Sequence, residues 1–131
     1  MSSLFTKIIN KQIPSYKIVE DENFYAFLDI NPLEKGHTLV VPKIEVDYIF
    51  DIEDDMFAKM HLFAKKVALA IDKSIDCKRV GVAIIGLEVA HAHIHLIPLY
   101  RDAINFSNPK KSFSSEEFKE IANLISSNLV L

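Results

Sequence analysis

The strongest constraint on the fold of this chain is a run in which histidine alternates with apolar residues at positions 91, 93 and 95. Side chains at every second position of a strand point to one face, so the three imidazoles would project from one side of a single strand. Successive rings would start roughly 6.6 Å apart, close enough to share one phosphate or metal ion. Ala92, Ile94 and Leu96 would face the other way and be buried. We therefore predict a strand over His91–Pro98.

Other segments are rich in β-branched and aromatic residues, which predicts further strands. The polar turn Asp21-Glu22-Asn23 separates two of them, as in a hairpin, and Gly36 and Pro42 bound the next. Together with the histidine run, the expected strands span residues 16–20, 24–30, 37–42, 79–85 and 91–98. The sequence therefore predicts about five strands in an antiparallel sheet.

A long helix is predicted from Asp51 onward, because apolar residues recur there at intervals of three and four. We expect Asp51 to cap this helix. The predicted buried positions are Met56, Met60, Phe63, Ala64, Val67, Ala70 and Ile71.

Shorter helices are predicted at both ends of the chain. Leu4, Phe5, Ile8 and Ile9 have helical spacing. Near the C terminus, Ser114–Glu117 has the pattern of a capping box. The apolar stripe that follows it consists of Phe118, Ile121, Leu124 and Ile125. The predicted fold class is α+β: about five antiparallel strands, one long helix and two shorter terminal helices.

Composition limits the functional classes. The 131 residues, 50% of them hydrophobic, suffice for one core and predict one domain over residues 1–131. The formal net charge of −3 argues against a general nucleic-acid binder, which usually carries a basic face. Cys77 is the single cysteine, the N-terminal residues lack the apolar stretch of a signal peptide, and no run of eighteen apolar residues occurs. We expect a cytoplasmic protein without nucleic-acid or membrane partners.

The three alternating histidines allow three interpretations. Imidazoles at alternate strand positions can share a zinc, copper or iron ion. They can also be structural, either solvated on a sheet face or bonded to the backbone, although clusters of ionisable groups favour a functional site. In the third interpretation one imidazole is a nucleophile toward phosphorus, and its neighbours manage charge and protons.

The run His91-Ala92-His93-Ile94-His95-Leu96-Ile97 resembles the histidine-triad motif of the HIT superfamily of nucleotide hydrolases and transferases. Earlier segments resemble the family's opening segment and two of its strands, in the family's order: Leu4–Ile9 with Gln12–Pro14, Phe24–Pro32 and Gly36–Lys43. In length, the chain is most similar to the Hint branch, whose members are homodimeric purine nucleoside phosphoramidases or nucleotidyl hydrolases.

The resemblance implies a HIT-like fold and a role for each histidine. His93 corresponds to the nucleophile that takes a nucleoside monophosphoryl group and then loses it to water. His95 would contact the phosphate oxygens and assist proton transfer, and His91 would orient the site and balance its charge. His37 lies where the family has a fourth histidine, which supports the triad from behind. This scheme requires no metal or other cofactor.

The resemblance also implies a nucleotide-binding site. Asp29 corresponds to the carboxylate that accepts hydrogen bonds from the ribose hydroxyls, although it could instead be a simple turn residue before Asn31-Pro32. The residues expected around a purine base, each of which could alternatively be a core residue, are Leu4, Phe5, Ile8, Phe27, Leu28 and Ile30. The implied partners are a purine nucleotide of the AMP or GMP kind and a second copy of the chain.

One segment departs from the family pattern. Many Hint members have an Asn and a Gly-Gln-Ser/Thr-Val element before the triad, whereas this chain has Gly86-Leu87-Glu88-Val89. A carboxylate near a phosphate would repel it, unless Glu88 faces solvent, is protonated or meets a cationic leaving group. The departure leaves the preferred leaving group open. The resemblance as a whole implies a phosphoramidase-like nucleotide hydrolase, which cleaves purine nucleoside phosphoramidates or related nucleotidyl esters or anhydrides at the α-phosphorus. The alternatives are a dinucleoside polyphosphate hydrolase and a non-catalytic nucleotide-binding or interaction protein.

Overall fold

The structure, a computed structural model, describes residues 2–101 and 104–130, so positions 1, 102, 103 and 131 of the predicted domain lie outside the described residues. It contains a five-stranded antiparallel sheet with the strand order β1-β2-β3-β5-β4, which confirms the predicted α+β class. The strands are β1 (Lys17–Glu20), β2 (Phe24–Leu28), β3 (Thr38–Pro42), β4 (Arg79–Ala83) and β5 (Ile94–Leu99). The first four lie within their predicted ranges and are one or two residues shorter.

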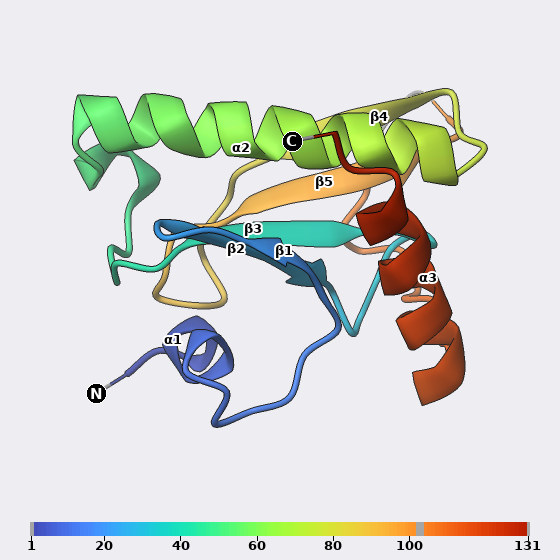
Figure 1. The fold of residues 1–131 in the computed structure, drawn as a ribbon, viewed down its shortest axis with the longest axis horizontal. Helices are drawn as coiled ribbons and strands as arrows, with labels where there is room; N and C mark the ends of the chain where they lie inside the picture. The colour runs from blue at the N-terminus through green and yellow to red at the C-terminus, as the bar shows by residue number, and fades with distance from the viewer. Residues whose placement is uncertain (1, 102–103, 131) are drawn as a thin grey trace.

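The two faces of the sheet are covered by different helices (Figure 1). The long helix α2 (Asp54–Ser74) lies along one face and contacts β2, β3, β4 and β5. The short helix α1 (Leu4–Ile9) lies at the opposite face, and α3 (Ser115–Ser127) packs against α2 and β1. No helix of the described residues is long and apolar enough to cross a membrane.

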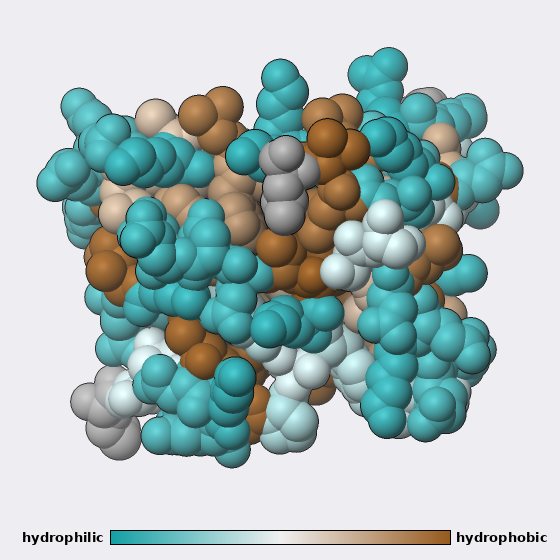
Figure 2. Space-filling view, viewed as in Figure 1, coloured by the Kyte–Doolittle hydropathy of each residue, from teal (hydrophilic) through white to brown (hydrophobic). Residues whose placement is uncertain are grey.

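Strand alternation divides the apolar side chains into two clusters. On β2, Phe24, Ala26 and Leu28 belong to the main core beneath α2, whereas Tyr25 and Phe27 belong to a smaller cluster on the α1 side. The remaining buried members of that smaller cluster are Phe5, Ile8, Leu39 and Val41. Apolar side chains gather beside α1 on an otherwise largely hydrophilic lower surface (Figure 2). The α1 face of the sheet therefore carries an apolar surface separate from the main core.

The predicted start of the long helix is wrong. Helix α2 begins at Asp54 with Glu53 as its N-cap, whereas Asp51 ends a short 3-10 turn, η1 (Ile49–Asp51). Ile49 and Ile52 are both buried in the main core, and the chain has to turn between them before the helix can begin. Of the predicted buried positions, Met60, Ala64, Val67, Ala70 and Ile71 are buried, and Met56 and Phe63 pack at the edge of the core.

Helix α3 starts where its sequence predicts. Ser114 and Glu117 form the reciprocal capping box, in which each side chain bonds the backbone N–H of the other residue. The buried stripe differs from the predicted one at a single position, because Ala122 is buried and Leu124 is 43% exposed. The positions Phe118, Ile121, Ala122 and Ile125 follow the i, i+3, i+4, i+7 spacing of one helix face, which Leu124 does not.

Candidate functional site

The predicted strand over His91–Pro98 is wrong at its beginning. Strand β5 starts at Ile94, so His95 lies on the strand, while His91 and His93 lie in the segment that leads into it. The pairing of β3 with β5 stops at Val40 and Ile94, before β3 itself ends at Pro42. In the segment before Ile94, the Ala92 N–H donates to the Val46 carbonyl, and the Pro42 carbonyl accepts from the His91 ring.

The predicted alternation of faces holds despite this shorter strand. Ala92, Ile94 and Leu96 are buried in the core beneath α2. The His93 and His95 rings face the α1 side, where their centroids lie 4.9 Å apart. Extended backbone on either side of the strand boundary is therefore enough to place these two imidazoles together.

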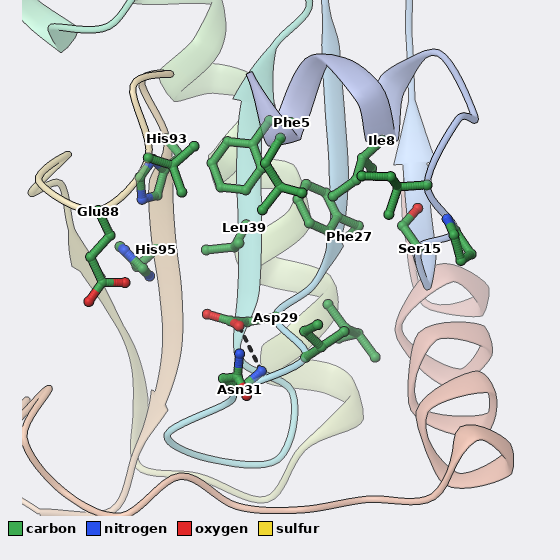
Figure 3. A pocket seen from close by; sticks show the side chains of 16 residues that line it. Phe5, Ile8, Ser15, Phe27, Asp29, Asn31, Leu39, Glu88, His93 and His95 are labelled. Atoms are coloured by element: carbon green, nitrogen blue, oxygen red, sulfur yellow. Dashed lines mark hydrogen bonds between the residues drawn. The ribbon is translucent and has the colours of Figure 1, made fainter. Parts of the chain in front are cut away.

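His93 and His95 line a pocket between α1 and the sheet (Figure 3). The residues predicted around a base all line this pocket: Leu4, Phe5, Ile8, Phe27, Leu28 and Ile30. Two of them, Leu4 and Ile30, are 46% and 63% exposed and form its rim, whereas the Leu28 side chain packs in the main core on the opposite face. Sequence reasoning did not assign six further lining residues: Ile13, Pro14, Ser15, Asn31, Leu39 and Val89.

The His93 ring is oriented by the backbone of the residue two positions earlier. Its Nδ1 atom lies 2.8 Å from the His91 carbonyl oxygen, and because a carbonyl only accepts, Nδ1 carries the proton. In the neutral ring the lone pair is then on Nε2. Among the described residues, every buried side-chain nitrogen or oxygen atom has a hydrogen-bond partner. His93 Nε2 has no such partner, so this atom is not buried and is accessible. The hydrogen bond to the His91 carbonyl therefore leaves Nε2 as the ring nitrogen that faces the pocket.

A second hydrogen-bond chain fixes the tautomer of His95. The Leu33 N–H donates to His37 Nδ1 at 3.0 Å, so the neutral His37 ring carries its proton on Nε2. His37 Nε2 donates to His95 Nδ1 at 2.9 Å, which leaves the His95 proton on Nε2. His95 therefore offers an N–H donor beside the lone pair of His93.

Three histidines around His93, namely His37, His91 and His95, are neutral at pH 7. Burial lowers the pKa of His37 to about 4, although the nearby Asp29 carboxylate acts in the opposite direction. Burial, followed by the neighbouring His93 and His37, lowers the pKa of His95 to about 3. Burial also lowers the pKa of His91, against the hydrogen bond to the Pro42 carbonyl. His95 is thus a hydrogen-bond donor that does not readily take up a second proton.

Asp29 makes the turn interaction that its sequence context suggested, and it also lines the pocket. One carboxylate oxygen accepts the Asn31 N–H at 2.9 Å, which is the expected turn interaction (Figure 3). The other oxygen lies 3.6 Å from His37 Nε2, and the side chain is 19% exposed where it lines the pocket. The turn thus holds the carboxylate at the pocket wall.

His91 is fully buried and lies behind the pocket wall. Its Nε2–H donates to the Pro42 carbonyl at 2.8 Å, and its Nδ1 accepts from the Ser3 hydroxyl at 2.7 Å. Ser3 is also the N-cap of α1, and the Glu45 carboxylate accepts from the Ser3 N–H and the Thr6 hydroxyl. This cluster attaches the start of α1 to the histidine segment. Sequence reasoning missed it.

One group of side chains within residues 2–101 and 104–130 could hold a metal ion. It consists of Asp29, His37 and His95, whose potential ligand atoms lie within 4.8 Å of one another. Among these described residues, His91, His93 and His95 do not form such a group. The metal interpretation based on that triplet is therefore not supported by the geometry.

Comparisons with known proteins relate the whole chain to one family. The family model described as the HIT domain matches residues 10–102. An uncharacterized HIT-like protein of Borreliella burgdorferi is 38% identical over 96% of this chain and 97% of its own. The adenosine 5'-monophosphoramidase of Schizosaccharomyces pombe is 33% identical over 98% of this chain and 99% of its own. The crystal structure of a Hit-like protein involved in cell-cycle regulation from Bartonella henselae has a TM-score of 0.86 and 29% identity, covering 98% of this chain and 96% of that one.

Proposed function

The chain belongs to the HIT family, and we propose that its pocket binds a purine nucleoside phosphoramidate or a related nucleotidyl ester or anhydride, which it hydrolyses at the α-phosphorus. The observation that carries this proposal is the His93 ring, whose Nδ1–H is held by the His91 carbonyl and whose Nε2 lone pair is accessible. The similarity to a protein named adenosine 5'-monophosphoramidase supports the same reaction class.

The wall of the pocket suits a nucleoside. Phe5, Ile8 and Phe27 form an apolar surface for a planar base, and the Phe5 and Phe27 rings meet edge to face at 5.7 Å. Asp29 offers a carboxylate, which accepts hydrogen bonds and therefore matches two neighbouring ribose hydroxyls. We assign the base to the apolar wall and the ribose to Asp29.

In the first step, His93 Nε2 attacks the α-phosphorus and the bond from phosphorus to the leaving amine or phosphate breaks. For an amine, the electron pair of that bond goes to nitrogen, which takes a proton from solvent. The product is a nucleotidyl-histidine whose ring is positively charged.

In the second step, water attacks phosphorus, the bond to Nε2 breaks, and a proton returns to solvent. The net products are the amine and a nucleoside monophosphate. His95 Nε2–H donates to a phosphoryl oxygen as negative charge develops there. We assign His95 to this hydrogen bond rather than to the proton transfer expected from the sequence, because its pKa of about 3 makes it a poor proton carrier at pH 7.

A homodimer and a cytoplasmic location stay predictions from the sequence and the resemblance. The edge strand β4 supports the homodimer, since its Val82 is 59% exposed and Ile85 beyond its end is 50% exposed. Sedimentation velocity at micromolar concentration tests the homodimer, and a single species with the mass of one chain would contradict it.

The reaction is tested with adenosine 5'-phosphoramidate and a diadenosine polyphosphate, each incubated with and without a chelator. We expect AMP from the phosphoramidate at the faster rate and no effect of the chelator. Tight AMP binding without any turnover would instead identify a nucleotide-binding protein. His61→Asn is a suitable control variant, because His61 lies on α2 and bonds the Phe57 carbonyl, away from the pocket.

A further inference from the structure

Glu88 places a negative charge at the catalytic end of the pocket. It lines the same pocket as His93 and His95 and lies on their side of it (Figure 3). The residue is exposed, and its carboxylate takes part in none of the ion pairs or side-chain hydrogen bonds of the described residues. The carboxylate is therefore available to a ligand.

No positive side chain offsets this charge inside the pocket. Among the described residues that line it, the ionisable groups are the carboxylates of Asp29 and Glu88 and the imidazoles of His93 and His95, with no Lys or Arg. The His95 ring is neutral at pH 7 because burial lowers its pKa to about 3. A leaving group that brings further negative charge next to Glu88 therefore meets no compensating positive side chain in the pocket.

The position of Glu88 relates it to the leaving group rather than to the nucleoside. In the proposed binding mode, the base lies on Phe5, Ile8 and Phe27, and the ribose lies at Asp29. The phosphorus then lies at His93, and the leaving group extends from it on the side away from the ribose. Glu88 lies at this end of the pocket, beside His93 and His95 (Figure 3).

We propose that Glu88 makes the site selective for phosphoramidates whose leaving amine carries a second, positively charged ammonium group, and that it disfavours polyphosphate leaving groups. This inference rests on the proposed hydrolysis and names its substrate class. If the ammonium group lies about 6 Å from the Glu88 carboxylate, at an effective dielectric constant of about 40, their attraction changes kcat/KM roughly tenfold relative to a leaving amine without that charge. The preference should weaken with added salt, because Glu88 is exposed.

The test uses AMP joined through nitrogen to 1,4-diaminobutane or to pentylamine, which replaces the ammonium group by a methyl group. The value of kcat/KM is measured for both compounds and for diadenosine triphosphate, at low and high salt. Glu88→Gln removes the charge and keeps the shape. Glu22→Gln is the matched control, because Glu22 is also exposed, lies in the turn between β1 and β2 and does not line the pocket.

The native chain and Glu22→Gln should prefer the diamine compound over the pentylamine compound by roughly tenfold at low salt. In Glu88→Gln this preference should fall to about one, and diadenosine triphosphate should be cleaved faster than by the native chain. Equal rates for the two amines in the native chain, or an unchanged preference in Glu88→Gln, would overturn the inference while leaving the proposed hydrolysis intact. Absence of turnover with every substrate would overturn the proposed hydrolysis itself.

Discussion

His37 Nε2 lies 2.9 Å from His95 Nδ1, although the two residues are 58 positions apart in the sequence. The contact exists because β3 and β5 pair in antiparallel register, with Leu39 opposite His95. Since His37 Nδ1 already accepts the Leu33 N–H, the direction of this hydrogen bond is fixed. One backbone amide thereby determines which nitrogen of His95 carries its proton.

Replacing His37 with alanine should disturb both stability and the His95 tautomer. The change leaves the Leu33 N–H and His95 Nδ1 without their partner in a buried region, which costs about 1–3 kcal/mol of unfolding free energy. Urea denaturation measures this loss. Long-range ¹H–¹⁵N spectra should show the His95 proton on Nε2 in the native chain and a mixture of tautomers in His37→Ala. The same spectrum in both proteins would contradict the proposed hydrogen-bond chain.

Stability should fall with acid before the carboxylates titrate. The folded-state pKa is about 4 for His37 and about 3 for His95, below the value of about 6.5 expected in the unfolded chain. At pH values between the folded-state and unfolded-state pKa values, the unfolded chain binds protons that the native state does not. The unfolding free energy therefore has its full value above about pH 6.5 and decreases as the pH falls. Each histidine contributes a slope of up to about 1.4 kcal/mol per pH unit.

Urea titrations at pH 7, 6 and 5 measure this acid dependence. The His37→Gln variant lacks one of the titrating rings and should have a shallower slope than the native chain over this range. Equal slopes for the two proteins would show that the His37 ring is not held neutral in the native state.

Replacing Asp29 with asparagine should weaken nucleotide binding without unfolding the turn. The amide oxygen can still accept the Asn31 N–H, but the negative charge toward the ribose is removed. Calorimetry should show AMP affinity reduced about tenfold or more, consistent with the loss of hydrogen bonds to a charged group. The same substitution should hardly change the affinity for 2',3'-dideoxy-AMP. Equal losses for both ligands would remove the ribose role from Asp29.

Replacing Ser3 with alanine should loosen α1. The variant loses the N-cap of the helix and the donor to His91 Nδ1, so unfolding free energy should fall by about 1 kcal/mol. Because α1 carries Phe5 and Ile8 to the base wall, KM should also rise, with a smaller effect on kcat. Ser2→Ala is the control, as Ser2 is exposed and precedes the cap. A Ser3→Ala variant with the stability and KM of Ser2→Ala would contradict this role.

Local patterns in the sequence predicted most of the fold. The spacing of apolar residues located α2 and α3, and the alternation around His93 placed Ala92 and Ile94 in the core. These features depend on the period of one helix or strand, which is visible in a single chain. The wrong N-cap of α2 shows the limit, because burial of Ile49 and Ile52 overrides the local capping preference of Asp51.

The residues of the candidate site could be predicted only where they belong to a recognisable sequence motif. The three alternating histidines were singled out by their spacing, and His37 and Asp29 were assigned through the resemblance to a family. The cluster of Ser3, Thr6 and Glu45 around His91 was not predicted. Its members are separated by 39 to 88 positions except for the Ser3–Thr6 pair, and no periodic signal joins them. Serine, threonine and glutamate are common at protein surfaces, so contacts of this kind between distant residues can be identified only from the three-dimensional structure.

The most direct test of the central claim is the detection of a nucleotide covalently attached to His93. The native chain is mixed with an adenosine phosphoramidate, denatured within milliseconds and digested, and the peptides are examined by mass spectrometry. We expect one adenylylated peptide with the modification on His93, no adduct in His93→Ala, and an unchanged adduct in His61→Asn. AMP formation by the native chain with an adduct on another residue, or full turnover by His93→Ala, would contradict the account.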